Sequence, residues 1–157
     1  MVILRNAMNA TFQRYETLRV GGVELRLFLD ENGALCAVEL PKEIPAALDA
    51  ETLKQIIDEL SKRNIALGRA GDFTRRVWER MREIPAGETM TYSALAAAIG
   101  NPRAARAVGA AVGANPLLIL LPCHRVVAKN GLGGFREGLA WKEKLLALEQ
   151  SIALAAR

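Results

Sequence analysis

The sequence predicts an α+β protein in which a small antiparallel sheet with one helix precedes a helical domain. Residues 12–40 alternate apolar and polar side chains, later segments carry apolar stripes with helical spacing, and glycines within residues 68–71 separate the two regions. The chain has 157 residues, of which 51% are hydrophobic, enough for a real core. We therefore expect an N-terminal domain at 1–68 and a C-terminal domain at 69–157.

Strand patterns fill the first domain. Residues 23–29 alternate in the manner of a half-buried strand, and residues 34–40 form its expected partner. The turn between them is Asp30-Glu31-Asn32-Gly33, whose Asn-Gly pair tolerates positive φ. An earlier strand at 12–20 is expected to join them after a turn at Gly21-Gly22, which completes the sheet.

Two amphipathic helices are expected next. Asp49 can cap the first and Asp72 the second, because an aspartate side chain accepts hydrogen bonds from the free N–H groups that begin a helix. The second helix ends at Pro85 and Gly87. The apolar stripes are Leu53, Ile56, Ile57 and Leu60 in the first helix, and Phe73, Val77, Trp78, Met81 and Ile84 in the second.

A helix-turn-helix pattern follows these helices. Residues 92–99 form a short helix that ends at Gly100, and Asn101-Pro102 restart the chain as a helix with Asn101 as the N-cap. The pattern alone is a weak signal, because many helical hairpins bind nothing. The second helix carries small residues, with Arg103 and Arg106 on one face. Such a helix suits close approach to a groove of DNA or to a packed neighbouring helix.

The charge is distributed unevenly along the chain. The net charge is +4, but residues 1–68 hold eight basic and ten acidic side chains (−2), whereas residues 69–157 hold thirteen and seven (+6). The basic half favours a polyanionic partner, of which nucleic acid is the commonest. The alternative is a solvated surface that is merely basic.

Metal and membrane functions are not expected. Cys36, Cys123 and His124 are the only cysteine and histidine residues, too few for a structural zinc site, so we expect no metal and no cofactor. No apolar run approaches the ~20 residues of a membrane helix, and the N-terminus does not resemble a signal peptide. We expect a soluble, cytoplasmic protein with reduced thiols and no membrane partner.

The segment that carries chemistry begins at Asn115. Asn115-Pro116 opens an extended apolar run at 117–121, which leads through Pro122 to Cys123 and His124. An imidazole beside a thiol can take its proton and leave the nucleophilic thiolate, although a cysteine is more often an ordinary core residue. Neighbours on a strand point to opposite faces, so His124 is expected to reach Cys123 through a turn or a bridging water.

The last helix, at residues 138–149, places two charged residues among its apolar ones. Lys142 and Glu149 fall within one arc of about 120° that also holds Leu139, Leu145 and Leu146. One interpretation is that Lys142 snorkels at the edge of the stripe while Glu149 is exposed. The other is that Glu149 points inward to accept a hydrogen bond from His124, while Lys142 contacts backbone near Cys123.

Several motifs together resemble one family. They are Pro-Cys-His-Arg-Val at 122–126, Gly-Asn-Pro-Arg-Ala-Ala-Arg-Ala-Val-Gly at 100–109, Asn115 eight residues before the cysteine, and Gly-Leu-Ala-Trp-Lys at 138–142. In this order and spacing, over residues 72–149, they resemble the O6-methylguanine-DNA methyltransferases. The resemblance implies a winged-helix-like helix-turn-helix in the C-terminal domain and, in outline only, a ribonuclease H-like N-terminal domain.

The resemblance also implies a reaction. Cys123 is similar to the family's alkyl acceptor, His124 to its water-linked base, Glu149 to the carboxylate that polarises the histidine, and Asn115 to its hinge asparagine. The implied function is direct-reversal DNA repair. An O6-alkylguanine is flipped out of the duplex, and its alkyl group passes irreversibly to Cys123 in a single turnover.

Contacts to the damaged base are implied in the same way. Tyr92 would donate its hydroxyl to guanine N3, and the backbone carbonyl of Val126, with that of the cysteine, would bind the guanine amino group. Lys142 would contact backbone near this site. Phe135 and Arg136 stand where many relatives carry Tyr-Ser on the loop that walls the alkyl pocket, which leaves tolerance of bulky groups open.

Contacts to DNA complete the implied site. Arg106 is similar to the arginine finger that fills the gap left by the flipped nucleotide, on a recognition helix that lies in the minor groove. The implied partner is double-stranded DNA, bound by a monomer. The other implied DNA contacts are Thr74, Ser93, Asn101, Arg103 and Lys129.

Two other functions stay open from the sequence. A lesion-binding protein would flip alkylguanine and signal for repair without chemistry, but family relatives of that kind lack the cysteine. A thiol hydrolase would use Cys123, His124 and Glu149. The sequence shows no sign of the oxyanion hole and acyl pocket that it would need, and the basic half would be unexplained.

Overall fold

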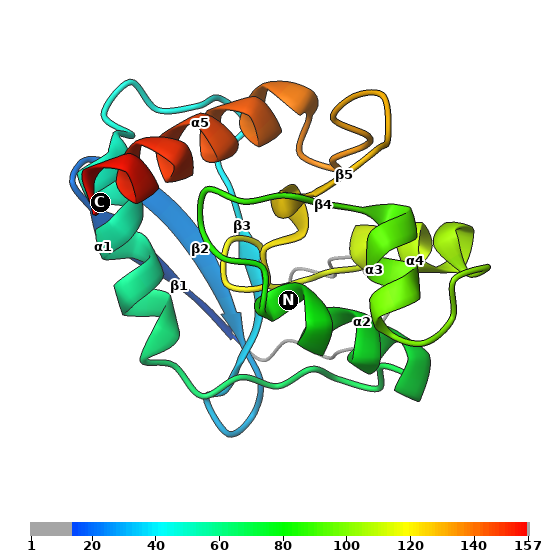
Figure 1. The fold of residues 1–157 in the computed structure, drawn as a ribbon. Helices are drawn as coiled ribbons and strands as arrows, with labels where there is room; N and C mark the ends of the chain where they lie inside the picture. Colours follow the sequence, from blue (N-terminus) through cyan, green and yellow to red (C-terminus); the bar gives the residue numbers. More distant parts are fainter. Residues whose placement is uncertain (1–13, 157) are drawn as a thin grey trace. The chain divides into compact units, whose positions relative to one another are not determined.

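The computed structural model describes residues 14–156, so Phe12 and Gln13 of the predicted first strand lie outside the described residues. The protein is a mixed α/β structure with a small antiparallel sheet and several helices (Figure 1). Its described residues form two compact units. The first runs to Ala70 and includes Pro116–Leu120, and the second comprises Gly71–Asn115 and the chain from Leu121 onward.

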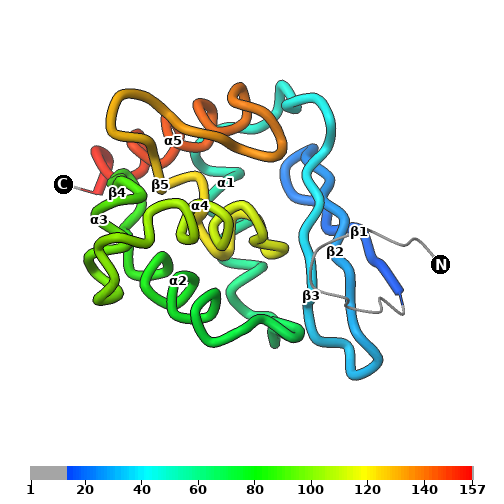
Figure 2. Tube along the Cα trace, turned by 90° about the vertical axis from the view of Figure 1, so that its right-hand side faces the viewer, coloured from blue at the N-terminus to red at the C-terminus, as the bar shows by residue number. Residues whose placement is uncertain are grey.

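The sheet of the first unit has the predicted hairpin order. Strands β1 (Arg14–Val20), β2 (Val23–Leu29) and β3 (Leu35–Glu39) lie side by side in the order β1-β2-β3, all antiparallel (Figure 2). In the turn before β3, Gly33 has a φ of 78°, the positive φ that the Asn-Gly pair predicts. The strand predictions are thus confirmed within the described residues.

Helix α1 (Ala50–Ser61) completes this unit, and its predicted cap is confirmed. The side chain of Asp49 accepts a hydrogen bond from the backbone N–H of Thr52 at 2.8 Å. The stripe is buried except for Ile57, which is half-buried. The buried apolar residues of β2 and α1 are Val23, Leu25, Leu27, Phe28, Leu29, Leu53, Ile56 and Leu60.

The second unit is mainly helical. Its elements are α2 (Asp72–Arg82), β4 (Met90–Thr91), α3 (Tyr92–Ala98), α4 (Ala105–Gly113), a 3₁₀ turn (Cys123–Arg125), β5 (Val126–Val127) and α5 (Leu139–Ala155). The short parallel pairing of β4 with β5 was not predicted, since two-residue strands leave no periodic signal. Its buried apolar core includes Val77, Trp78, Met81, Ile84, Leu95, Val108, Trp141 and Leu145.

Two predicted helix starts are wrong. Helix α2 has Gly71 at its N-cap position, and Asp72 lies in the first turn instead of capping it. Helix α4 begins at Ala105 instead of Pro102, because the N–H of Ala104 bonds to the Asn101 carbonyl at 3.0 Å and closes a turn. Arg103 therefore lies in that turn and does not share a helical face with Arg106.

The predicted extended run before the cysteine is also wrong. Leu117 forms a single parallel bridge to Val38, and then the chain turns repeatedly. The N–H of Leu120 bonds to the carbonyl of Leu118 at 2.8 Å, and Ile119 has a φ of 70°. A branched residue in this left-handed region is strained by about 1–3 kcal/mol, which burial of the three apolar side chains at 117–119 offsets.

Candidate active site around Cys123

Cys123 opens the 3₁₀ turn that follows this irregular segment. Its thiol is free, and the residue is only 6% exposed. Burial raises the pKa of the Cys123 thiol to about 11, against the opposing effects of a hydrogen bond with Asn115 and of the charges on Arg136 and Lys142. The charge on Glu137 adds to the increase in pKa. At neutral pH the thiol is therefore protonated, and it needs a base to become a nucleophile.

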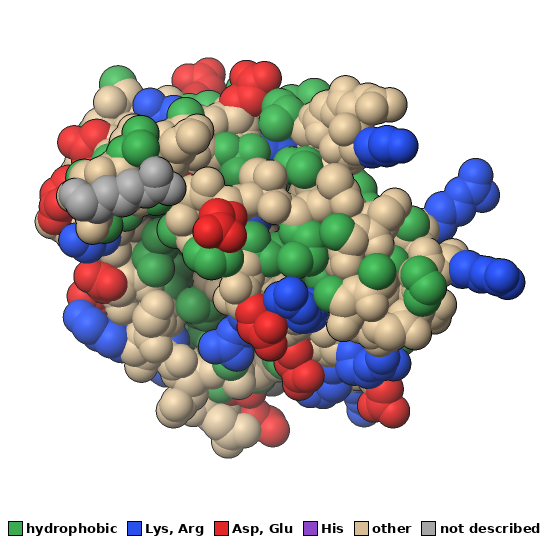
Figure 3. Space-filling view, in the orientation of Figure 1, with side chains coloured by type: hydrophobic (Ala, Val, Ile, Leu, Met, Phe, Trp, Pro, Cys, Tyr) green, Lys and Arg blue, Asp and Glu red, His purple; other side chains and the backbone are tan. Residues whose placement is uncertain are grey.

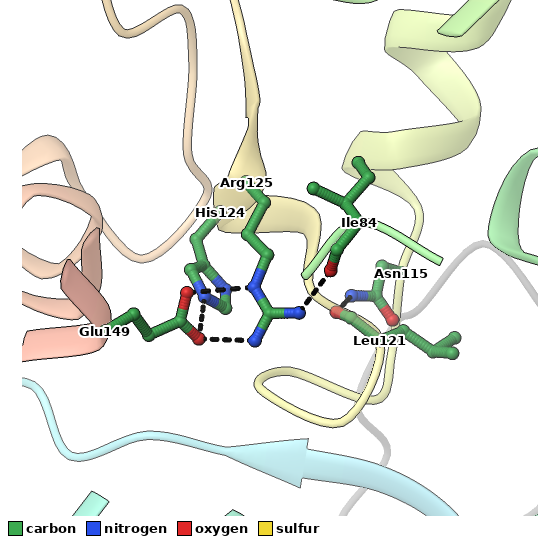
Figure 4. Close-up of polar contacts among 6 residues, drawn as sticks. All are labelled: Ile84, Asn115, Leu121, His124, Arg125 and Glu149. Carbon is green, nitrogen blue, oxygen red and sulfur yellow. Dashed lines mark hydrogen bonds and ion pairs between the residues drawn. The ribbon is translucent and has the colours of Figure 1, made fainter. Parts of the chain in front are cut away.

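The neighbouring imidazole is paired with the predicted carboxylate. The side chains of His124 and Glu149 are both completely buried, and His124 Nε2 lies 2.8 Å from Glu149 Oε1 (Figure 4). This confirms that Glu149 points inward from α5. The other ring nitrogen, Nδ1, is buried and has no hydrogen-bond partner within residues 14–156.

Arg125 binds Glu149, a contact that was not predicted from the sequence. Its Nε and Nη2 atoms donate to the two carboxylate oxygens of Glu149 at 2.8 and 2.7 Å, and its Nη1 donates to the carbonyl of Ile84 at 2.6 Å (Figure 4). Burial works to raise the pKa of Glu149, but hydrogen bonds from Arg125 and His124 outweigh it and hold that pKa at about 2. The available signal was the position of this arginine inside the Pro-Cys-His-Arg-Val motif, next to a histidine that was expected to pair with a carboxylate.

Asn115 shapes the approach to the cysteine. The residue is buried, and its Nδ2 donates to the carbonyl of Leu121 at 2.7 Å, which closes the segment between α4 and the 3₁₀ turn (Figure 4). The same side chain hydrogen-bonds with the Cys123 thiol. One asparagine thus links the chain path before the nucleophile to the nucleophile itself.

Lys142 is completely buried beside this site, so the snorkelling interpretation is wrong. Its Nζ donates to the carbonyl of Val126 at 2.7 Å and to that of Gly134 at 3.0 Å, and burial lowers its pKa. Leu139, which shares the arc of the helical wheel with Lys142, is the first residue of α5 and is 49% exposed. Trp141 is buried instead.

The loop before α5 lies against Tyr92, the first residue of α3. Tyr92 is half-buried, its hydroxyl hydrogen-bonds with the backbone of Gly134, and burial raises its pKa. Gly133 has a φ of 73°, and a Cβ there would lie 2.9 Å from the Tyr92 ring. The loop backbone therefore approaches Tyr92 as closely as a residue without a side chain allows.

Further along this loop, Arg136 connects the predicted pocket wall to the site. Its Nη2 donates to the Asn115 carbonyl at 3.2 Å, and its Nε pairs with Glu137 at 3.1 Å. Phe135 is half-buried. Glu137 was not singled out in the sequence, yet its Oε2 is buried and has no hydrogen-bond partner in the described part of the chain.

The predicted DNA-contact residues do not share one element. Arg106 is exposed on α4, whose opposite side packs against α2 and α3, so the helix has both a packed and a free face. Figure 3 shows Lys and Arg side chains projecting at the edge where α3 and α4 lie in Figure 1. Thr74 is half-buried on α2. The other predicted DNA-contact residues are exposed: Ser93, Asn101, Arg103 and Lys129.

Neither a membrane helix nor a metal cluster is found within residues 14–156. No helix there combines the length and the apolar character needed to cross a bilayer. No three His, Cys, Asp or Glu side chains in that range are grouped as a metal site requires.

Comparison with known proteins agrees with this geometry. The family model for "6-O-methylguanine DNA methyltransferase, DNA binding domain" matches residues 72–151. A probable methylated-DNA–protein-cysteine methyltransferase of Acanthamoeba polyphaga mimivirus is 58% identical over 78 residues, which are 50% of this chain and 52% of that protein. The chain spans about half the length of the curated relatives it matches.

Solved structures match over more of the chain. The crystal structure of Mycobacterium tuberculosis O6-methylguanine methyltransferase has a TM-score of 0.68 and 32% identity, covering 88% of this chain and 93% of that chain. The structure of Mycobacterium tuberculosis OGT in complex with DNA has a TM-score of 0.68 and 33% identity, covering 87% and 92%. The chain therefore belongs to the O6-methylguanine-DNA methyltransferase family.

Proposed function

We propose that this protein repairs DNA directly, by moving an alkyl group from O6 of guanine to Sγ of Cys123. One observation carries the proposal: the cysteine of the family motif adjoins a histidine whose imidazole is paired with a buried carboxylate, 2.8 Å away. That arrangement suits a base that takes the thiol proton. Curated relatives of the same family are named methylated-DNA–protein-cysteine methyltransferases.

The reaction balances with the groups at this site. The thiol proton leaves through a bridging water to Nδ1 of His124, and the thiolate attacks the alkyl carbon. The S–C bond forms as the C–O6 bond breaks, and the electron pair stays with the guanine, which takes up one proton. The product is a thioether on Cys123. It has no simple route back to the thiol, so we expect a single turnover per molecule.

Three further residues would hold the guanine. The Tyr92 hydroxyl would donate to guanine N3, and its raised pKa keeps it protonated and able to donate. The Val126 carbonyl would accept from the guanine amino group, with its second lone pair occupied by Lys142 Nζ at 2.7 Å. Lys142 thus positions the carbonyl that reads the base.

The alkyl group would lie near the loop that carries Phe135 and Arg136. The Arg136 guanidinium already binds the Asn115 carbonyl and the Glu137 carboxylate. A charged pair beside the thiol restricts the space for a large substituent. We expect methyl to be transferred faster than benzyl.

DNA would be bound through the minor groove by the α4 side of the second unit. A relative of this chain was crystallised with DNA, and the matched family domain is a DNA-binding domain. O6 cannot be reached inside a stacked duplex, so the base is flipped at a cost of a few kcal/mol. Arg106, exposed on α4, would fill the gap. The other proposed DNA contacts are Thr74, Ser93, Asn101, Arg103 and Lys129.

The finer organisation belongs to the same proposal. Residues 1–68 would form a domain with a ribonuclease H-like outline, and residues 69–157 a winged-helix-like DNA-binding and acceptor domain. The protein would act as a monomer in the cytoplasm, on the nucleoid. The basic excess of the second region is consistent with that place.

Intact-protein mass spectrometry tests the reaction. After incubation with duplex DNA containing O6-methylguanine, we expect a gain of one methyl group per protein, mapped to Cys123. Cys123→Ser should bind the DNA without gaining mass, while Cys36→Ser, the matched control at the other free thiol, should gain the methyl normally. Binding without mass gain in the unaltered protein would instead identify a lesion-binding protein.

A second experiment tests base flipping. Arg106→Ala should slow repair of duplex DNA more than it slows attack on a free O6-alkylated guanine base, because only the duplex requires extrusion. Equal slowing of both reactions would remove the finger role from Arg106.

A further inference from the structure

The carboxylate that faces His124 is shared with a second group. Glu149 Oε1 accepts from Arg125 Nη2 at 2.7 Å and lies 2.8 Å from His124 Nε2, while Oε2 accepts from Arg125 Nε at 2.8 Å. Arg125 is held in turn by the Ile84 carbonyl, which follows α2, at 2.6 Å. The guanidinium therefore contacts both carboxylate oxygens and is anchored at a third point.

The charges of this cluster balance without a contribution from His124. An arginine side chain stays protonated in proteins, and the Glu149 carboxylate stays ionised, so the two charges cancel. The His124 and Glu149 side chains are completely buried. While the Cys123 thiol keeps its proton, a protonated imidazole would therefore add an uncompensated charge to a buried site, which is unfavourable.

The hydrogen bonds then select one tautomer. Glu149 is ionised and can only accept, so a neutral His124 must carry its proton on Nε2 to bond to Oε1. The lone pair is left on Nδ1, the buried ring atom that no group within residues 14–156 engages. This is the nitrogen that can take a proton from the thiol.

We propose that Arg125 is a positioning residue that neutralises Glu149 and thereby keeps His124 as the neutral Nε2–H tautomer, with Nδ1 free to act as the base. The role of Nδ1 in the reaction rests on the proposed function, whereas the tautomer does not. Within residues 14–156, the side chains that act on Glu149 are those of Arg125 and His124. Lys142 on the same helix binds the Val126 and Gly134 carbonyls, while Glu137 and Arg136 act on the cysteine.

Removing the guanidinium should change the state of the histidine. In Arg125→Met the Glu149 carboxylate keeps only His124 as a partner, and protonation of the imidazole is the nearest way to balance it. Both ring nitrogens then carry protons, and the base is lost. In the double variant Arg125→Met/Glu149→Gln both charges are absent, so the imidazole should be neutral again, with its Nε2–H bonded to the amide oxygen. Arg125→Lys keeps the charge and should keep the tautomer.

The single histidine of the chain makes the test direct. Ring ¹⁵N chemical shifts of histidine-labelled protein at pH 7 distinguish a protonated from an unprotonated nitrogen. We expect one of each in the unaltered protein, in Arg125→Lys and in the double variant, and two protonated nitrogens in Arg125→Met. Arg80→Met removes an arginine from the partly exposed pair with Glu83 in the same unit, and it should leave both shifts unchanged.

The outcomes separate this inference from the proposed function. Two protonated nitrogens in the unaltered protein or in the double variant, or an unchanged tautomer in a folded Arg125→Met, would overturn the role of Arg125. If Arg125→Met does not fold, the unaltered protein and the double variant still decide. The expected tautomer without methyl transfer to Cys123 would refute the repair reaction and leave the positioning role intact.

A kinetic measurement provides the second readout. Loss of the base should slow methyl transfer in Arg125→Met about 100-fold at pH 7, with recovery as the pH rises and the imidazole loses its proton. Arg125→Lys should retain most of the rate. A loss that is equal at every pH would indicate a purely structural role and would contradict the inference.

Discussion

Replacing Glu149 by glutamine should destabilise the protein at pH 7 and remove much of its sensitivity to acid. The substitution keeps the size of the side chain but removes its charge, so Arg125 loses its ionic partner in a site where Glu149 is completely buried. Breaking one side of a buried ion pair costs about 3–5 kcal/mol. We expect a loss of that size in the free energy of unfolding at neutral pH.

The pH dependence follows from the pKa of the carboxyl group. Its folded pKa is about 2, compared with an ordinary value of 4.5. A pKa shift of one unit corresponds to about 1.36 kcal/mol, so the ionised carboxylate contributes roughly 3 kcal/mol to the free energy of unfolding. A lowered folded pKa means that this contribution is complete above about pH 5 and is lost as the pH falls toward 2. The variant has no carboxyl group there and lacks this loss.

Urea denaturation at a series of pH values measures the difference. Both tryptophans, Trp78 and Trp141, are buried in the second unit, so their fluorescence follows the unit that holds the pair. The difference in the free energy of unfolding between the unaltered protein and Glu149→Gln should be largest at pH 7 and should become smaller by roughly 3 kcal/mol near pH 2. Glu83→Gln, which removes an exposed carboxylate from its pair with Arg80, should cost less than about 1 kcal/mol. Parallel pH profiles for the unaltered protein and Glu149→Gln would refute the reasoning.

Two further predictions concern the turn between α2 and β4, which packs against α5, and the thiol of Cys123. Gly87→Ala should lower the thermal unfolding temperature of the protein more than Gly100→Ala does. Both glycines have a positive φ, but only at Gly87 would the new Cβ meet another side chain, that of Ala153 at 2.6 Å. Equal losses would show that backbone strain alone decides. Glu137→Gln should speed alkylation of Cys123 by iodoacetamide at pH 8, because the charge on Glu137 helps to raise the thiol pKa to about 11; an unchanged rate, read on the Cys123 peptide by mass spectrometry, would contradict that influence.

Local patterns predicted the elements whose signals are contained in a few neighbouring residues. The alternation at residues 23–29, the Asn-Gly turn and the cap at Asp49 all appear in the structure as expected. In each case the hydrogen bonds and the burial that favour the element come from residues close in sequence. The family resemblance was also visible in the sequence, because its motifs over residues 72–149 are defined by residue type and spacing and need no tertiary contact.

Predictions failed where a competing local turn or a distant contact overrode the expected element. Asn101 and Pro102 have the residue types that begin a helix, yet a turn closes at Ala104 and delays α4 to Ala105. The apolar run before Cys123 has the composition of a strand, yet it turns repeatedly after Leu117 bridges to Val38. Residue type could not decide either case, because Asn101 and Pro102 suit a turn as well as a helix start, and the bridging partner of Leu117 lies far away in β3.

The chemical groups of this protein can be read from its residues alone: a nucleophile, one imidazole, a carboxylate on the last helix and a basic second half. Folding adds the contacts of Arg125 with the carboxylate that faces His124, and the burial of Lys142 against two carbonyls. The physical reason is that charge compensation in a buried site depends on which groups meet in space. Arg125 and Glu149 are 24 residues apart in the chain, and only folding brings them together.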